Sequence, residues 1–332
     1  MNNNLLNLSP LDGRYEKDLV ELKSFFSEMS LIKYRIKIEI EYLIALSNEK
    51  EIKSLKPFTK KEIDNLRKIY LQFDLSEAKK IKKIENETNH DVKAIEYYLH
   101  TRIKKELHAW IHFGLTSEDI NNLCYTLMWK DSIENEYIKI LIKVIDELKL
   151  ISKKYKNISL LSLTHGQPAS PTTVGKEFAV FSHRITKSLK SLRKHSFEAK
   201  FSGATGNWSA HSVSFKEVNW VEFSKKFLIS FDLQPNLITT QIEPNDSLAE
   251  SFHGIVRINT ILIDFCQDIW LYISRGVFKQ KKIAMEIGSS TMPHKINPIN
   301  FENAEGNLGL SNAILNHLAM KLSISRMQRD LS

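Results

Sequence analysis

Cysteine, glycine and proline are scarce in this chain of 332 residues, which contains 2 Cys, 11 Gly and 8 Pro. Because glycine and proline are the residues that interrupt regular structure, their scarcity leaves most of the length free to form long helices. Cys124 and Cys266 lie in apolar helical patterns and lack metal-ligand spacing. They predict buried free thiols in a reducing compartment.

Long apolar runs are also missing. No run approaches the roughly 18–20 residues that are needed to span a bilayer. The segment from Met1 to Leu8 has no basic region followed by an apolar core, so no signal peptide is visible. These features predict a soluble, cytoplasmic protein with no membrane partner.

The charge is moderately basic, with 47 Lys plus Arg against 39 Asp plus Glu and a formal net charge of +8. Such an excess attracts anions of any kind, from phosphorylated metabolites to nucleic acid. The basic residues are spread along the chain, without a basic tail and without interleaved aromatic residues. We therefore expect no nucleic-acid partner.

What the chain does contain is apolar residues at helical spacing. Helices are predicted over residues 25–46, twice within 57–84, and over 116–155, 172–199 and 246–282. At 1.5 Å per residue the last would be a rod of about 50 Å. Helices this long suggest a bundle, often between subunits. No strand alternation is visible, so the predicted fold class is all-α, with an N-terminal helical domain at 1–115 and a long-helix bundle at 116–332.

Polar clusters fall at the ends of these helices. The segments are 9–15, with Arg14 and Tyr15 in a turn; 87–94, with Asn89, His90 and Asp91; 115–121, with Thr116 and Ser117; 162–168, with His165; and 235–244, with Gln241. Thr88 or Asn89 is predicted to cap one helix, and Thr116 or Ser117 the next. Capping alone explains these residue types, but helix N-termini also present free N–H groups to anions.

The most crowded cluster is Gly288 to Pro298. Its two prolines prevent a helix and favour extended geometry in the residues before them. It holds hydroxyls, an imidazole, an ammonium and an amide: Ser289, Ser290, His294, Lys295 and Asn297. Such a loop is suited to holding an anion, although an ordinary connection between helices would also account for it.

This loop resembles the signature of the fumarase/aspartase superfamily, Gly-Ser-Ser-x-Met-Pro-x-Lys-x-Asn-Pro, at every fixed position. The stretches Thr88–Ala94, Thr116–Asn121, Thr164–Gln167 and Asp12–Tyr15 resemble, more specifically, the adenylosuccinate lyase family in its bacterial form. The resemblance covers essentially the whole chain. It implies an all-α bundle that cleaves adenylosuccinate to AMP and fumarate, and succinylaminoimidazole carboxamide ribotide in the same way, in purine biosynthesis.

The resemblance also implies roles. His165 is the expected general acid and Ser289 the general base, while Lys295 and Asn297 would stabilise the developing charge and His90 would position the substrate or assist His165. Arg14 and Tyr15 resemble contacts to the nucleotide end of the substrate. Further substrate-binding positions are implied at Asn89, Asp91, Thr116, Ser117, Gln241, Ser290, Ile296, Asn303 and Arg329. No cofactor and no metal are implied. The implied partners are the succinylated purine nucleotide substrates and further copies of the chain, in a homotetramer whose sites each draw on three subunits.

Two departures from the family pattern are visible. Leu163 stands where the family commonly has Arg. The family also continues past the last residues of this chain with a Ser/Thr-Arg stretch and a C-terminal helical domain, so we expect a C-terminally truncated chain. Two alternatives stay open: another fumarate-releasing lyase, acting for example on argininosuccinate or carboxymuconate, and a non-catalytic helical scaffold.

Overall fold

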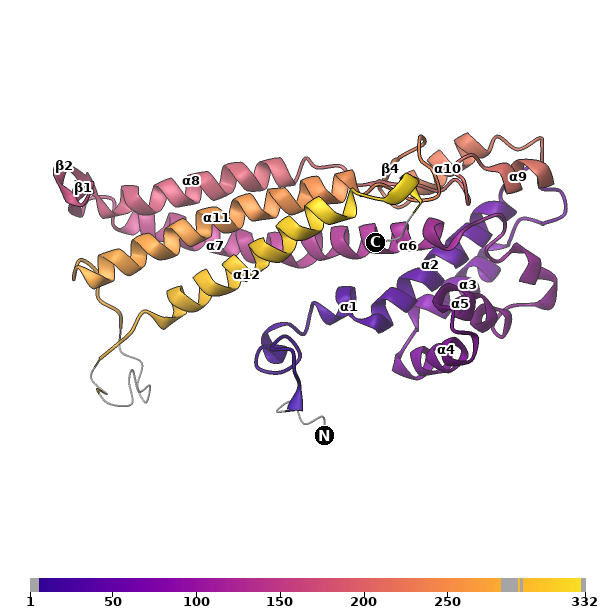
Figure 1. Ribbon diagram of the computed structural model, residues 1–332, viewed down its shortest axis with the longest axis horizontal. Helices are drawn as coiled ribbons and strands as arrows, with labels where there is room; N and C mark the ends of the chain where they lie inside the picture. The colour runs from indigo at the N-terminus through magenta and orange to yellow at the C-terminus, as the bar shows by residue number, and fades with distance from the viewer. Residues whose placement is uncertain (1–5, 282–291, 293–294, 330–332) are drawn as a thin grey trace. The chain divides into compact units, whose positions relative to one another are not determined.

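The structure is a computed structural model that describes residues 6–281, 292 and 295–329. The chain divides into two compact units (Figure 1). Unit 1 is Met1–Tyr137, Ser196–Asn245 and Ile324–Ser332, and unit 2 is Ile138–His195 and Asp246–Ser323. A boundary near residue 115 between an N-terminal domain and a bundle domain stays a prediction.

Unit 1 is built around one buried helix. Its helices are α1 (Lys23–Phe26), α2 (Glu28–Ser47), α3 (Lys60–Leu71), α4 (Leu75–Thr88), α5 (Asp91–His100), α6 (Ser117–Ser132), α9 (Ser209–Ser214) and α10 (Trp220–Ile229). Shorter turns are η2 (Glu16–Asp18), η3 (Lys105–Trp110), the π-helical η4 (Ile133–Tyr137) and η5 (Arg326–Gln328). α2 contacts α3, α4, α5 and α6. Because it is surrounded, apolar side chains such as Ile36 and Leu43 are completely buried.

Unit 2 is an antiparallel helix bundle (Figure 1). It contains α7 (Ile138–Lys154), α8 (Val174–Leu192), α11 (Asp246–Ser274) and α12 (Ile299–Leu322). α8 packs on α7 and α11, and α11 also packs on α12. Phe181 meets Phe265 edge to face across the α8–α11 seam, with ring centroids 5.2 Å apart. The all-α fold class is therefore confirmed.

Short strands are nevertheless present, although no strand alternation is visible in the sequence. β1 (Ser159–Thr164) and β2 (Gln167–Thr173) form an antiparallel hairpin in unit 2. β3 (Glu198–Ala199) and β4 (Gln234–Pro235) pair in parallel in unit 1. The hairpin is largely exposed, so it lacks the regular apolar alternation by which a half-buried strand is recognised.

Two helix ends also differ from prediction. α11 stops at Ser274, short of residue 282, because Gly276 takes φ = +72°. The N–H groups of Gly276 and Val277 then donate to the carbonyls of Ile273 and Tyr272, as in a Schellman cap. α8 spans Val174–Leu192, not 172–199, because the residues before it belong to β2 and residues 198–199 belong to β3.

Both cysteines are buried and free, as predicted. Within the described residues, no helix combines the length and the apolar character needed to cross a membrane.

Candidate active site

The junction of α4 and α5 in unit 1 carries three of the predicted residues. Asn89 ends α4 with φ = +50°, and its N–H donates to the carbonyl of Glu85. His90, not Thr88 or Asn89, is the N-cap of α5, so that part of the capping prediction was wrong. His90 Nδ1 accepts a hydrogen bond of 3.2 Å from the N–H of Lys93. The proton of the neutral imidazole therefore lies on Nε2, on a side chain that is 53% exposed.

A hollow of about 490 Å³ lies beside this junction. It is lined by Asn89, His90 and Asp91 together with Glu85 and Asn86. Three substrate-binding residues predicted from the sequence thus line one cavity.

Arg35 of α2 connects this hollow to α6. Its side chain is buried, and Nη2 lies 2.5 Å from Oδ2 of Asp91 while Nε donates to Oδ1 of Asn121 at 3.0 Å. Burial acts to raise the pKa of Asp91, but attraction to Arg35 and the N–H of Val92 outweigh it and hold the pKa below its usual value. Asp91 is therefore an oriented, ionised carboxylate at neutral pH.

The start of α6 brings two more predicted residues together. Thr116 is the N-cap, and its N–H donates to Oδ2 of Asp119 at 2.9 Å. Gln241 Nε2 lies 3.5 Å from Thr116 Oγ1, although the two residues are 125 positions apart. Ser117 is the first residue of the helix, and the Asp119 N–H already donates to the Thr116 carbonyl at 2.9 Å. The first-turn N–H groups beside these side chains that lack a helical carbonyl partner are therefore those of Ser117 and Glu118.

Glu118, in the same turn, was not predicted as a site residue. It is 8% exposed, and burial raises its pKa to about 7 despite the opposing attraction of Lys200. Near neutral pH this carboxyl exists as a mixture of its protonated and ionised forms. Nothing in the sequence pattern distinguishes it from an ordinary first-turn Glu.

The remaining predicted residues of unit 1 lie in turns. Tyr15 N–H donates to the carbonyl of Pro10 at 2.9 Å, and the guanidinium carbon of Arg14 lies 5.9 Å from the Tyr15 ring centroid. Arg329 follows η5, where the carbonyl of Gln328 accepts a hydrogen bond from the hydroxyl of Thr240. This contact joins the segment of Arg329 to the segment of Gln241.

In unit 2, His165 stands at the tip of the β1–β2 hairpin. Thr164 pairs with Gln167, so His165 and Gly166 alone form the turn, with φ of +51° and +73°. Positive φ at both positions is typical of a type I′ turn, which suits the twist of a hairpin. The side chain of His165 is exposed, and Leu163 lies in β1 opposite Pro168.

The predicted catalytic loop is described in part. Ser289 and Ser290 lie outside the described residues, as does His294. Lys295 N–H donates to the carbonyl of Met292 at 3.0 Å. Lys295 and Ile296 are exposed and Asn297 is half-buried, just ahead of α12. Asn303, in the second turn of α12, accepts a hydrogen bond of 2.6 Å from Asn307 Nδ2.

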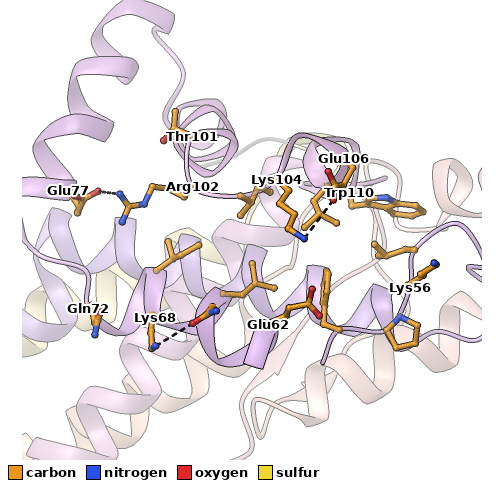
Figure 2. Close-up of a pocket in the computed structure, with 18 of the residues that line it drawn as sticks. Lys56, Glu62, Lys68, Gln72, Glu77, Thr101, Arg102, Lys104, Glu106 and Trp110 are labelled. Atoms are coloured by element: carbon orange, nitrogen blue, oxygen red, sulfur yellow. Dashed lines mark hydrogen bonds and ion pairs between the residues drawn. The ribbon is translucent and has the colours of Figure 1, made fainter. Parts of the chain in front are cut away.

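A second, larger cavity of about 970 Å³ lies in unit 1, and none of the predicted residues lines it (Figure 2). Its carboxylates already have partners: Arg102 lies 3.8 Å from Glu77, and Lys104 lies 3.9 Å from Glu106. Glu62 accepts from the N–H and hydroxyl of Thr59 at the start of α3. Among the described residues, no group of three or more His, Cys, Asp or Glu side chains could hold a metal ion.

Comparison of the sequence with known proteins identifies the family to which the chain belongs. Residues 13–313 match the family model described as Lyase. The chain is 47% identical over 330 residues to the adenylosuccinate lyase of Haemophilus influenzae and 48% identical over 330 residues to that of Escherichia coli. Each alignment covers 98% of this chain and 72% of the relative. The adenylosuccinate lyase of Dictyostelium discoideum is 49% identical over 99% of the chain and 73% of its own length.

The chain belongs to the adenylosuccinate lyase family. The fold agrees with membership. A fumarate lyase from Mesorhizobium sp. BNC1 superposes with a TM-score of 0.71 at 15% identity, covering 93% of this chain and 67% of the other. A 3-carboxy-cis,cis-muconate lactonizing enzyme from Pseudomonas putida gives 0.71 at 20% identity, covering 93% and 68%.

Sequence reasoning missed a residue that holds the candidate site together but lies outside the polar motifs. Arg35 lies in the middle of an apolar helix and is 56 positions from Asp91. Family resemblance identifies residues in motifs, but it gave no reason to single out a lone Arg in the 25–46 helix. Only the folded chain reveals its two contacts.

Proposed function

We propose that this chain cleaves adenylosuccinate to AMP and fumarate, and succinylaminoimidazole carboxamide ribotide to the corresponding carboxamide ribotide and fumarate. It is a carbon–nitrogen lyase of purine biosynthesis. The observation that carries this proposal is the identity of 47–49% to adenylosuccinate lyases over 98–99% of the chain. The N-terminal ends of α5 and α6 supply N–H groups, hydroxyls and amides suited to a substrate with one phosphate and two carboxylates.

The reaction needs an acid and a base. A proton leaves the carbon next to a carboxylate, the negative charge spreads into that carboxylate, and the C–N bond breaks as the nitrogen is protonated. In our proposal Ser289 accepts the first proton and His165 donates the second. Lys295 stabilises the serine alkoxide, since a serine is a poor base without such help, and Lys295 and Asn297 stabilise the charge on the carboxylate.

His90 and its neighbours position the substrate in this proposal. Because Nδ1 of His90 accepts from Lys93, its Nε2–H is available to donate to a substrate oxygen. Asp91 is held by Arg35 beside the same hollow, and Asn89 adds its amide. His90 thereby orients the reacting group or assists His165.

The start of α6 is proposed to hold an anionic group of the substrate. Thr116 and Gln241 lie 3.5 Å apart beside the first helical turn, where Ser117 adds a hydroxyl. Helix N-termini bind phosphates and carboxylates through free N–H groups. The remaining proposed substrate contacts are Arg14, Tyr15, Ser290, Ile296, Asn303 and Arg329.

We further propose a cytoplasmic homotetramer, with each site drawn from three subunits and the chain organised as domains 1–115 and 116–332. α12 supports an intersubunit bundle, since within it only Leu315 and Ala319 are buried. Leu310, Ile314 and Met320 are 60%, 52% and 67% exposed, an apolar surface that a second copy would cover. His165, exposed at a hairpin tip, is well placed to enter a neighbour's site.

A fumarate-release assay tests the function. The purified chain is incubated with adenylosuccinate, succinylaminoimidazole carboxamide ribotide, argininosuccinate and carboxymuconate in parallel. Turnover of the first two alone is the expected result. Turnover of one of the others alone would assign a different lyase reaction, and no turnover of any would leave the non-catalytic scaffold. Sizing chromatography of the same sample tests the tetramer.

A further inference from the structure

Lys200 is fully buried, with 0% of its side chain exposed. It follows β3, and its main chain is held on both sides by one residue of α6: Lys200 N–H donates to Asn122 Oδ1 at 3.0 Å, and Asn122 Nδ2 donates to the carbonyl of Lys200 at 3.1 Å. A buried ammonium is costly unless every N–H finds a partner. The hydrogen-bond partners of the Lys200 ammonium therefore indicate its role.

The ammonium of Lys200 has three oxygen partners. Nζ donates to the carbonyl of Gln241 at 2.6 Å and to the carbonyl of Gly203 at 2.8 Å, and it lies 3.1 Å from Oδ1 of Asp119. Three partners use the full donor capacity of an ammonium. Lys200 thus joins three chain segments at one point.

Asp119 is equally buried and extends this junction to Thr116. Its carboxylate accepts from the N–H groups of Ser202 at 3.0 Å, Gly203 at 3.1 Å and Thr116 at 2.9 Å. The pair is therefore bonded directly to the main chain of Thr116 and of Gln241. These are the two residues whose side chains meet at the start of α6.

The loop that follows Lys200 packs tightly against residues 239–240. Gly206 has φ = +73°, and an added Cβ would lie 2.2 Å from the carbonyl oxygen of Thr239. Ser202 Oγ lies 3.3 Å from Thr239 Oγ1. Because main chain meets main chain here, a change at Lys200 is passed on to residues 239–241 instead of being absorbed by the loop.

We propose that Lys200 and Asp119 are positioning residues for substrate binding, which fix the main chains of Gln241 and Thr116 so that their side chains face one anionic group of the substrate. The inference rests on the proposed function, in which Thr116, Ser117 and Gln241 contact the substrate. A buried ion pair seldom adds stability over an apolar pair of similar volume. The pair instead orients the main chain, because each of its polar atoms is bonded to a particular main-chain N–H or carbonyl group.

The test uses the double variant Lys200→Met with Asp119→Asn, which removes both charges and retains an oxygen for the N–H groups. KM and kcat for adenylosuccinate, the affinity for AMP by calorimetry and the melting temperature are measured together. The expected result is a KM raised at least about tenfold, with kcat changed less than about threefold and AMP affinity reduced in parallel.

The matched control is Lys130→Met. Lys130 is also a buried lysine of unit 1, 3.1 Å from Glu134 and 3.2 Å from Asp232, but neither partner belongs to a proposed substrate segment. This variant is expected to lower the melting temperature and leave KM unchanged. It separates the general effect of losing a buried lysine from the effect on the site.

A second variant, Lys200→Arg, keeps the charge but cannot place one nitrogen among the same three oxygens. It is compared in the parent and in a Gln241→Ala background. Positioning through Gln241 predicts that the rise in KM caused by Lys200→Arg largely disappears once Gln241 is gone.

Folded variants with the parent's KM and AMP affinity would overturn the proposal, as would additive effects of Lys200→Arg and Gln241→Ala. Failure of both variants to fold would assign the pair to folding alone and overturn it as well. A parent chain that binds AMP but releases no fumarate contradicts the proposed reaction while the AMP measurements still decide the positioning. A parent chain that does neither overturns both.

Discussion

The guanidinium of Arg35 lies 2.5 Å from the carboxylate of Asp91 and, through Nε, 3.0 Å from the amide oxygen of Asn121. One buried side chain thereby fixes residues of α5 and α6 relative to each other. Both contacts depend on the planar, forked shape of the guanidinium, which an ammonium cannot reproduce. Arg35 therefore orients the hollow at residues 89–91 without being part of a polar motif.

Arg35→Lys is expected to raise KM for adenylosuccinate about tenfold, which corresponds to about 1.4 kcal/mol of binding free energy. The charge is retained, but one of the two contacts is lost and Asp91 turns. Steady-state kinetics measures the effect. Arg67→Lys is the matched control, because Arg67 bonds Glu41 through Nε at 2.8 Å and Nη2 at 2.7 Å, away from the proposed site. An equal rise in KM in both variants would contradict a specific role for Arg35.

The raised pKa of Glu118 makes stability depend on pH. Because the folded state holds this proton more tightly, the neutral carboxyl contributes stability that is complete below about pH 4.5 and is lost as the pH rises through about 7. Glu118→Gln removes the cost of burying the ionised form. At pH 8 the variant is expected to be more stable than the parent by at most about 3 kcal/mol, with the gain shrinking toward pH 5.

Urea unfolding of Glu118→Gln and of the parent across pH 5–8 measures this difference. Glu106→Gln is the control, since the side chain of Glu106 is 71% exposed, and its curve should follow that of the parent. A gain in stability that is constant with pH would show that burial of the charge is not its cause.

His165 can be replaced without disturbing the turn that carries it. Asn tolerates positive φ better than most residues, so His165→Asn keeps the two-residue hairpin while removing the proposed acid. Fumarate release is expected to fall about 10²–10⁴-fold with an unchanged melting temperature. A fall of less than about tenfold would exclude His165 as the proton donor.

Gly166→Ala tests the same turn by introducing backbone strain next to His165. With φ = +73°, an added Cβ is expected to cost about 1 kcal/mol, and it has room, since its nearest neighbour would be Arg275 Nη2 at 3.7 Å. We expect a small loss of stability and a clear loss of kcat, as His165 is displaced. Thermal melting and kinetics of the same sample distinguish the two effects.

How much of the molecule was predictable depends on distance along the chain. The helices follow from apolar spacing, and Thr116 as the N-cap of α6 follows from local capping rules. The end of α11 also has a local cause, the Schellman cap at Gly276. The sequence alone does not distinguish a glycine that ends a helix from a glycine that is tolerated inside one. The β1–β2 hairpin was missed because its exposed strands carry no alternating apolar face.

The supporting contacts could not be predicted, because each joins residues far apart. Ser202 bonds Asp119 across 83 positions, and Gln241 meets Thr116 across 125. Nothing local in the sequence marks Lys200 as buried, since lysine is among the residues most often exposed. Motifs indicate the residues that we propose to contact the substrate, whereas the fold was needed to find the residues that hold them in place.

Fumarate release by the parent chain and by Ser289→Ala tests the central claim most directly. Both proteins are given adenylosuccinate, and the product is followed by absorbance while circular dichroism and sizing chromatography compare their folds. We expect the parent to release AMP and fumarate, and Ser289→Ala to be slower by about 10²–10⁴-fold with the same fold and assembly. Equal rates in the two proteins, or no release by the parent, would contradict the account.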